Sequence, residues 1–339
     1  MGPIHKILIV RTDRLGDVLL TTPVSRLLKE HDPALYVAWL VRPYTAPLLE
    51  HNPDVDEVIT DPGGSVKPLI RRLREGRFDA AIIAYPRWRA AWATCRAAIP
   101  VRIGPASKLY SAFFSERLWQ HRSESARHEA DYNLELLAPM GIPFRRTPTR
   151  LVLTDKEKLA ARKRLESERV TFRKPVVILH PGSGGSSSRW PLAHFIELGD
   201  RLQETGCDVV VTGGPGEDYQ YTMIDQMRRQ PVFMAAGSVG IRELAALLSC
   251  ASLVVTNSTG PLHMAVAMGT PTVSVYSPVA ACHPRRWGPY PAYVEGNAAQ
   301  TVMVAPERGP SEADMAAVTV DQVWECCRKK LSSPEGIRV

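Results

Sequence analysis

A glycine and a carboxylate stand side by side near the N-terminus, in the stretch RTDRLGDVLLTTPVSRLL that runs from Arg11 to Leu28. The preceding KILIV predicts a buried strand, and apolar residues after Asp17 recur at helical spacing. Asp17 therefore follows a strand and opens a helix, at the edge of a sheet where α/β proteins bind their ligands. An aspartate there could cap the helix or could act as a general base, and the local sequence leaves both interpretations open.

Other residues of this stretch could take part in the same chemistry. Asp13 is a second carboxylate and the alternative candidate for the base. Arg11 and Arg14 could keep either carboxylate ionised or contact an acidic acceptor. The candidate substrate-binding residues here are Arg11, Asp13, Arg14 and Gly16.

Three loops in the second half of the chain also follow predicted strands. The first, HPGSGGSSSRWP, runs from His180 to Pro191 and precedes a helix. Its backbone N–H groups and hydroxyls, together with the positive charge of Arg189, could hold a phosphate. A flexible connection is the alternative, but it would not require an arginine and a tryptophan just before the helix. The candidate substrate-binding residues are Ser183, Ser187, Arg189 and Trp190.

The second loop, VTGGPGEDY, runs from Val211 to Tyr219 and lacks the GxGxxG spacing of dinucleotide-binding loops. Gly213 and Glu217 are its candidate substrate-binding residues. Glu217 could accept a hydrogen bond from a ribose or sugar hydroxyl. It could equally serve only to stabilise the N-terminus of the following helix, so both interpretations stay open.

The third loop, TNSTGPLHMAVAMGTP, runs from Thr256 to Pro271 and leads from a strand into a helix. The N–H groups and the dipole at the start of that helix favour an anion, although N-capping by Asn257 or Ser258 would explain the same residue types. A lone helix histidine is more often structural than catalytic, but His263 is about one turn from this site. The candidate substrate-binding residues are Asn257, Ser258, Thr259, Gly260 and His263.

Strands and helices must hold these loops in position, and the two kinds of element alternate along the chain. Such alternation predicts parallel sheets that helices cover on both faces. The first-half strands are expected at Lys6–Arg11, Leu35–Val41, Val55–Thr60, Phe78–Ala84 and Val101–Gly104. The first-half helices are expected at Pro68–Glu75, Arg87–Ala98 and Arg127–Met140.

The pattern restarts in the second half, after a strand-like LVL and a charged helix within Leu151–Lys174. Further strands are expected at Pro175–His180, Cys207–Gly214, Pro231–Ala236, Ser252–Asn257 and Pro271–Ser277. Helices are expected at Pro191–Gly206, Gly216–Arg229, Gly240–Cys250, Ser258–Gly269 and Val320–Leu331. We therefore predict two α/β domains, residues 1–160 and 161–339, with a ligand in the cleft between them. The last helix could reach back to the first domain.

The composition is that of a globular protein. Of the 339 residues, 45% are hydrophobic and 23% are charged, and no apolar run is long enough to cross a bilayer. The N-terminus is too short and too soon structured for a signal peptide. The six cysteines are scattered and include no CxxC pair, so we expect neither disulfides nor a zinc site. Together these features predict a cytoplasmic protein.

The net charge of +7 comes with clusters of basic residues. They lie at Arg71–Arg77, Arg87–Arg89, Phe144–Arg150 and Pro284–Trp287. Most of them fit solvated helix faces and loops. No helix-turn-helix, zinc-finger or RNP-type motif is present, so nucleic acid is not an expected partner. A phosphorylated small molecule or an anionic membrane surface would suit the charge equally well.

The motifs above occur in an order that resembles glycosyltransferase family 9, whose best-known members are the ADP-heptose:lipopolysaccharide heptosyltransferases. The resemblance rests on RTDRLGDVLLTTP, HPGSGGSSSRWP, VTGGPGEDY, TNSTGPLHMAVAMGTPTVSVYSP and HPRRWGP. It extends from about Lys6 to about Pro289. It implies a GT-B fold, in which two Rossmann-like parallel-sheet domains face a cleft. It also implies an inverting enzyme that needs no metal or cofactor, with the acceptor on the N-terminal domain and the donor on the C-terminal one.

By the match to the family's Gly-Asp pair, Asp17 is the catalytic base. An inverting displacement needs a carboxylate to take the proton of the attacking hydroxyl, and positive charge or dipoles to stabilise the leaving diphosphate. Arg189 and the helix N-terminus at Ser258–Gly260 would supply the second. Two positions depart from the pattern. Ser258 stands where many heptosyltransferases have aspartate, and Arg189 stands where lysine is frequent, which keeps the charge but alters the geometry.

The resemblance therefore implies transfer of heptose from ADP-heptose to the inner core of lipopolysaccharide. The acceptor would be a lipid-linked glycan. The enzyme would be a monomer that contacts the cytoplasmic face of the inner membrane. Ser258 keeps open another nucleotide sugar or a different acceptor. A nucleotide-sugar-binding protein without activity is a further alternative, but it would have no need of Asp17. The missing GxGxxG disfavours an NAD-dependent oxidoreductase.

Overall fold

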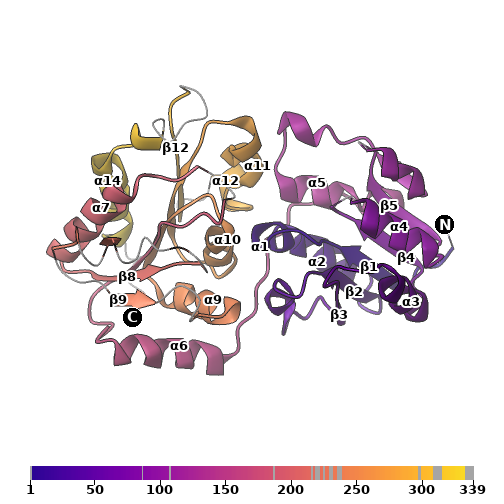
Figure 1. The fold of residues 1–339 in the computed structure, drawn as a ribbon, viewed down its shortest axis with the longest axis horizontal. Coiled ribbons are helices and arrows are strands. Elements are labelled where there is room, and N and C mark those ends of the chain that lie inside the picture. The colour runs from indigo at the N-terminus through magenta and orange to yellow at the C-terminus, as the bar shows by residue number, and fades with distance from the viewer. Residues whose placement is uncertain are drawn as a thin grey trace. The chain divides into compact units, whose positions relative to one another are not determined.

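The computed structural model describes residues 2–85, 87–106, 108–185, 188–214, 217, 222–223, 226–228, 232–234, 239–296, 299–307 and 315–332. The chain forms two compact units, Met1–Val152 and Leu153–Val339 (Figure 1). The predicted boundary after residue 160 falls later than this division, which leaves the whole of the charged helix α6 (Asp155–Ser167) in the second unit. The predicted α/β class with parallel sheets is confirmed.

The first unit is built on a six-stranded sheet with the order β3-β2-β1-β4-β5-β6, in which neighbouring strands pair in parallel. Its strands are β1 (Lys6–Val10), β2 (Tyr36–Val41), β3 (Glu57–Thr60), β4 (Ala80–Ile83), β5 (Val101–Pro105) and β6 (Glu116–Leu118). This is the doubly wound Rossmann order, and the direction of winding reverses between β1 and β4. The carboxyl ends of these two central strands therefore mark the place where a ligand is expected.

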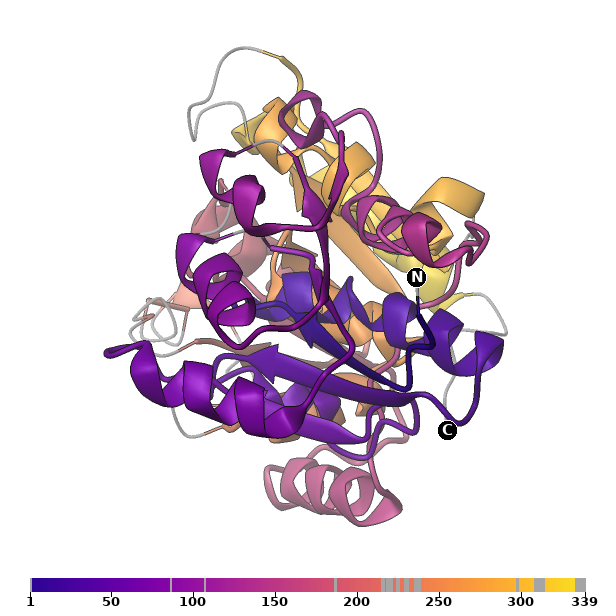
Figure 2. The ribbon, with the colours of Figure 1, turned by 90° about the vertical axis from the view of Figure 1, so that its right-hand side faces the viewer.

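Helices cover this sheet on both faces (Figure 2). They are α1 (Leu15–Leu19), α2 (Thr22–His31), α3 (Lys67–Gly76), α4 (Trp88–Arg96) and α5 (Glu129–Glu135). Short 3₁₀ segments are η1 (Ala46–Leu49), η2 (Leu109–Phe113), η3 (Arg122–Glu124) and η4 (Ala138–Met140). Because both faces are covered, four consecutive residues of β1, Ile7 to Val10, are fully buried.

Three details of the first unit differ from the prediction. The helix expected at Arg127–Met140 is shorter, because α5 ends at Glu135 and Ala138–Met140 forms the separate segment η4. The helix expected after β1 is divided into α1 and α2, and α2 has Pro23 in its first turn. Proline suits this position because its missing N–H has no partner there in any case. The remaining difference is β6, a three-residue edge strand that is too short to give a sequence pattern.

The second unit repeats the same topology with the order β12-β11-β10-β7-β8-β9. Its strands are β7 (Val176–His180), β8 (Asp208–Thr212), β9 (Val232–Met234), β10 (Leu253–Asn257), β11 (Thr272–Tyr276) and β12 (Gln300–Val304). Besides α6, its helical segments are α7 (Leu192–Glu204), α9 (Ile241–Cys250), α10 (Gly260–Ala267), η5 (Ala280–Cys282), α11 (Pro284–Trp287), α12 (Ala292–Glu295) and α14 (Val320–Leu331). The winding reverses between β7 and β10, so the carboxyl ends of these two strands mark the place where a ligand is expected in the second unit.

Some predictions for the second unit are wrong, and one lies mostly outside the described residues. The LVL segment forms no strand, and β12 was not predicted. Most of the helix predicted at Gly216–Arg229 lies outside the described residues. The last helix, α14, packs against α7 and the strands β10 and β11 of its own unit. None of the six cysteines forms a disulfide, as predicted. Within the described ranges, no helix combines the length and apolar character that crossing a membrane requires.

Replacing Thr154 tests how α6 begins. The Thr154 hydroxyl accepts the N–H of Glu157 at 3.3 Å, and the Glu157 carboxylate accepts the N–H of Thr154 at 2.7 Å. We expect Thr154→Ala to lower the free energy of unfolding by about 1 kcal/mol, because this reciprocal cap is lost. Thr154→Ser keeps the hydroxyl and should cost less. Urea unfolding of both variants measures the difference, and equal losses would contradict the cap.

Candidate active site

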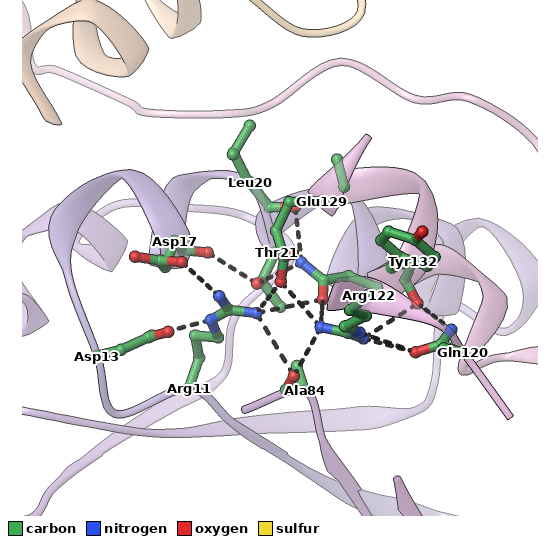
Figure 3. A network of polar contacts seen from close by, with 12 residues as sticks. Arg11, Asp13, Asp17, Leu20, Thr21, Ala84, Gln120, Arg122, Glu129 and Tyr132 are labelled. Atoms are coloured by element: carbon green, nitrogen blue, oxygen red, sulfur yellow. Dashed lines mark hydrogen bonds and ion pairs between the residues drawn. The ribbon is translucent and has the colours of Figure 1, made fainter. Parts of the chain in front are cut away.

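The first site is centred on Arg11, which directly follows β1. Its side chain is only 1% exposed, and three carboxylates surround its guanidinium (Figure 3). Nε donates to Asp13 at 2.8 Å, Nη2 to Asp17 at 2.5 Å and Nη1 to Glu129 at 3.0 Å. A buried guanidinium needs such partners, because an unpaired charge away from water is strongly destabilising.

A second guanidinium, that of Arg122 in η3, shares the Glu129 carboxylate with Arg11. Arg122 Nη1 donates to Glu129 at 2.8 Å and to the main-chain oxygen of Ala84 at 3.1 Å. Arg11 Nη1 lies 3.5 Å from the same Ala84 oxygen. Ala84 directly follows β4, so the two arginines meet where the winding of the sheet reverses. In a doubly wound sheet this is the position of the ligand site.

Asn133 of α5 connects the arginines to the helix that carries Asp17. Its Oδ1 accepts from Arg11 at 3.2 Å and from Arg122 at 3.3 Å, while its Nδ2 donates to the Thr21 hydroxyl oxygen at 3.0 Å. The Thr21 hydroxyl in turn donates to the main-chain oxygen of Asp17 at 2.8 Å. Asn133 is fully buried, so α5 fixes the position of α1 relative to the arginines.

Asp17 is the third residue of α1, and the N-cap position belongs to Arg14, whose side chain is exposed. The interpretation of Asp17 as an N-cap is therefore wrong, although a carboxylate in the first turn still favours the helix dipole. The Asp17 side chain is 14% exposed. Its Oδ1 accepts from Arg11, and no residue that the structure describes donates to its Oδ2. Oδ2 is thus the oxygen that could take a proton from a substrate.

The surroundings of Asp13 change its titration. Burial raises the pKa of Asp13 to about 7; the Arg11 guanidinium acts in the opposite direction, and the Asp17 and Glu129 carboxylates add to the rise. Burial alone would lower the pKa of Arg11, but the three carboxylates outweigh it and raise that pKa. Two guanidinium charges face three carboxyl groups here. With Asp13 protonated, the remaining charges balance.

The second unit brings the first and third of its predicted loops together through Asn257, the last residue of β10. Its Oδ1 accepts the N–H of Trp190 at 2.9 Å, and its Nδ2 donates to the main-chain oxygen of Pro181 at 2.7 Å. Asn257 is fully buried, so it braces the loop after β7. Capping of α10 by Asn257 or Ser258 is wrong, since Thr259 holds the N-cap position and makes no side-chain capping bond there.

Trp190 was expected to contact substrate, but its side chain belongs to the core of the second unit. It is 1% exposed, and its ring packs edge-on against Phe195 with 4.9 Å between ring centroids. Its Nε1 donates to the main-chain oxygen of Val318 at 2.8 Å, just before α14. The tryptophan before the helix therefore anchors the loop instead of lining it, a role that sequence spacing does not distinguish.

The Glu217 carboxylate joins the two glycine-containing loops. Oε1 accepts the N–H groups of Ser183 at 3.0 Å and Gly184 at 3.2 Å, and Oε2 accepts that of Gly214 at 2.6 Å. A Cβ on Gly182 would lie 2.1 Å from Oε2, so a larger residue at that position would displace the Glu217 carboxylate. The Glu217 carboxylate thus accepts hydrogen bonds from N–H groups of the loop that is predicted from the sequence to bind phosphate. Neither interpretation of Glu217 anticipated this contact.

His180 ends β7 beneath these loops. It is 4% exposed, and its Nδ1 lies 2.9 Å from the Thr212 hydroxyl oxygen. Burial lowers the pKa of His180 to about 4, and the nearby Glu217 carboxylate acts in the opposite direction. The imidazole is therefore neutral at physiological pH.

The remaining predicted residues of the second unit are placed as follows. Ser183 and His263 are buried, at 9% and 5% exposure. Arg189 is exposed, whereas Gly213 and Ser258 are half-buried. Gly260 is the first residue of α10, and Ser187 lies outside the described residues. The structure brings Arg11, Asp13 and Asp17 together in one network, and Ser183 and Glu217 in another.

Sequence reasoning missed three members of the first network, Arg122, Glu129 and Asn133. They lie more than 100 residues from Arg11 in the chain, and nothing in the local pattern connects them. The one available signal was Glu129 near the start of a predicted helix, and the helix dipole explains that equally well.

Comparisons with known proteins identify the family of this chain. Residues 66–312, more than half of the chain, match the model of glycosyltransferase family 9 (heptosyltransferase). The chain belongs to this family. A Haemophilus influenzae protein named only as a glycosyltransferase is 31% identical, covering 84% of this chain and 86% of its own length. The Escherichia coli lipopolysaccharide heptosyltransferase 3 is 28% identical, covering 80% of this chain and 82% of its own length.

Solved structures establish the GT-B type of fold for this family 9 glycosyltransferase. A family 9 enzyme from Veillonella parvula superimposes with a TM-score of 0.84 at 23% identity, covering 96% of this chain and 97% of its own. The E. coli ADP-heptose lps heptosyltransferase II gives a TM-score of 0.82 at 21% identity, covering 96% of this chain and 98% of its own.

The Asp13 carboxyl offers a direct check of the first network. We expect its ¹³C NMR resonance, identified by its loss in Asp13→Asn, to titrate near pH 7. The folded state then binds more protons than the unfolded state between about pH 4 and pH 7. The contribution of Asp13 to the free energy of unfolding is therefore fully present below about pH 4 and declines as the pH rises through 7. A resonance that titrates entirely below pH 5 would contradict this electrostatic account.

Proposed function

We propose that this family 9 glycosyltransferase transfers heptose from ADP-heptose to the inner core of lipopolysaccharide, in one inverting displacement that needs no metal ion. The named relative with heptosyltransferase activity at 28% identity supports the sugar and the acceptor. Structures of E. coli WaaC with ADP and with ADP-2-deoxy-2-fluoro heptose share the fold, with TM-scores of 0.73 and 0.71. Both support an ADP-linked donor.

The observation that carries the proposal is the pairing of Asp17 with Arg11. The guanidinium binds one oxygen of the Asp17 carboxylate at 2.5 Å, which fixes the direction of that carboxylate. The carboxylate would take the proton of the acceptor hydroxyl as that oxygen attacks the anomeric carbon of heptose. Asp13 is the alternative base, because a pKa near 7 also suits proton transfer at neutral pH.

The second unit would bind the donor. As the bond from the anomeric carbon to the diphosphate breaks, its electron pair leaves with ADP, and the negative charge needs stabilisation. Arg189 and the first N–H groups of α10 would provide this, since the Thr259 side chain does not cap that helix. The carboxylate of Glu217 now holds the N–H groups of Ser183 and Gly184, so we infer that donor binding rearranges this contact.

The acceptor would be a lipid-linked glycan that carries acidic sugars and phosphate, presented at the cytoplasmic face of the inner membrane to a monomeric enzyme. A different nucleotide sugar or acceptor is the second candidate. It is favoured by Ser258, which replaces the aspartate of many heptosyltransferases, and by the 31% identical relative, whose name specifies no substrate.

A transfer assay tests the proposed donor and acceptor. Purified protein is incubated with ADP-heptose and a heptose-free lipopolysaccharide core, and the product is detected by mass spectrometry. We expect addition of one heptose. Binding of ADP-heptose without transfer would point to another acceptor. Absence of binding would point to another donor and call for a panel of nucleotide sugars.

Substitution of the two aspartates distinguishes the candidate bases. Asp17→Asn should lower kcat by about 10²–10⁴-fold, because it removes the base while keeping the shape of the side chain. ADP binding, measured by calorimetry, should stay unchanged. Asp13→Asn should lower kcat much less and alter the pH profile. Asp155→Asn, at the fully exposed start of α6, is the matched control. A larger loss in Asp13→Asn than in Asp17→Asn would reverse the assignment.

Arg189 tests the donor side. We expect Arg189→Ala to weaken ADP-heptose binding by roughly tenfold or more, because a charge-assisted contact to the diphosphate is lost. Arg189→Lys should recover part of the affinity but not the planar geometry. The exposed Arg173→Ala serves as the control. Unchanged binding in Arg189→Ala would remove this residue from the donor site.

A further inference from the structure

Three large apolar side chains project into solvent from one edge of the first unit. Trp88, Leu109 and Trp119 are 59%, 98% and 78% exposed, whereas most large apolar residues of this unit are buried. Each follows the carboxyl end of a strand: Trp88 follows β4, Leu109 follows β5 and Trp119 follows β6. Because these strands are parallel and adjacent, all three residues lie at the same edge of the sheet.

The segments that carry these residues are fixed to one another. Helix α4 packs against η2, where the rings of Trp92 and Phe113 meet edge-to-face at 5.3 Å. The N–H of Ala106, shortly before η2, donates to the main-chain oxygen of Leu118 at 2.8 Å, next to Trp119. Since β4 and β6 are separated by one strand, their ends are about 10 Å apart. The exposed side chains therefore belong to one rigid edge and not to independent loops.

Basic side chains alternate with the apolar ones. Arg87 precedes Trp88, Lys108 precedes Leu109 and Arg117 comes shortly before Trp119. We call these six residues the basic apolar rim. All six are exposed, and neither Lys108 nor Arg117 has an acidic ion-pair partner among the described residues. Residues 87–127 contain eight Lys and Arg against two Glu, and three of the eight, Arg89, Arg122 and Arg127, pair with acidic residues outside this range.

The cluster at Arg71–Arg77, the first basic cluster in the sequence, is a weaker candidate. Arg72 pairs with Glu57, and Arg74 donates to the main-chain oxygen of Arg96 at 2.8 Å. Its charges are partly compensated within the protein, and no large exposed apolar side chain accompanies them on α3. The rim is the place where uncompensated charge and exposed apolar surface coincide.

The rim is continuous with the candidate active site. The ring of Tyr85, two residues after β4, lies 5.6 Å from the guanidinium carbon of Arg11 and 4.9 Å from that of Arg87. Arg87 also donates to the Tyr85 hydroxyl oxygen at 2.9 Å from Nε and 2.6 Å from Nη2. One aromatic side chain thus separates the arginine that holds Asp17 from the first residue of the rim.

We propose that the basic apolar rim docks this enzyme on an anionic lipid bilayer. Tryptophan is the side chain that membrane interfaces favour most, leucine adds apolar area, and lysine and arginine are attracted to anionic headgroups. A protein partner fits less well, since protein interfaces exclude lysine from their apolar centre. The inference rests on the proposed function and deepens it, because a lipid-linked acceptor would then be bound beside Asp17.

Co-sedimentation of the full chain with lipid vesicles tests the proposal. Vesicles of phosphatidylcholine are compared with vesicles that also contain about 30% phosphatidylglycerol. We expect the wild type to bind the anionic vesicles more tightly, and the tryptophan fluorescence to shift to the blue. The triple variant Trp88→Ser/Leu109→Ser/Trp119→Ser should bind at least tenfold more weakly. The control Leu159→Ser/Val304→Ser, which removes exposed apolar residues of the second unit, should bind like wild type.

A second pair of variants examines the charges. Lys108→Gln/Arg117→Gln should weaken binding to anionic vesicles roughly twentyfold at low salt, and it should hardly affect binding to neutral ones. The control Lys156→Gln/Lys163→Gln neutralises two exposed lysines of α6. Thermal unfolding shows that each variant is folded. Equal vesicle binding by the wild type and both rim variants, or no binding by any of them, would overturn the proposal.

Two further measurements separate this inference from its rivals. A dimer in sedimentation velocity that the triple variant abolishes would make the rim a self-association surface and overturn the proposal. Transfer to a soluble, lipid-free core acceptor should be unchanged in the triple variant, while transfer to lipid-anchored acceptor in vesicles should fall. If ADP-heptose is not a donor at all, vesicle docking still tests the rim by itself.

Discussion

The burial of one arginine side chain determines much of the structure around the candidate active site. Arg11 is 1% exposed, and a guanidinium cannot lose its proton to avoid the cost of leaving water. The fold meets this cost with carboxylates from the loop after β1, from α1 and from α5. The position of α1, and hence of Asp17, follows from where those partners must lie. Stability and chemistry therefore depend on the same hydrogen bonds in this region.

Sequence reasoning succeeded where a local pattern has a single structural outcome. Short apolar runs followed by glycine-containing or polar loops identified most strands of both sheets, and the carboxyl ends of β1, β7 and β10 were recognised as the places for chemistry. The matched motifs also gave the family correctly. Two edge strands, β6 and β12, were missed for a physical reason: their residues are largely half-exposed, so they lack the apolar run that marks a central strand.

The site itself was less predictable than the fold, because side-chain direction depends on tertiary contacts. Trp190 and Asn257 stand in loops with ligand-binding character, yet one is core and the other braces the main chain. Glu217 was expected to face solvent or a sugar, but it binds three N–H groups from two loops. Its position depends on the missing side chain of Gly182, a residue far from it in sequence. Long-range dependencies of this kind leave no periodic trace in one sequence.

The hydrogen bond from Trp190 to Val318 has a consequence for synthesis on the ribosome. The loop after β7 lies near the middle of the chain, but the indole that anchors it finds its acceptor only two residues before α14 begins. During translation, well over a hundred residues must follow the loop before that acceptor exists. The nascent second unit therefore keeps the Trp190 indole without this partner until its last helix is being made. Protection of that loop by chaperones, or its cleavage by proteases, would report how far elongation has advanced.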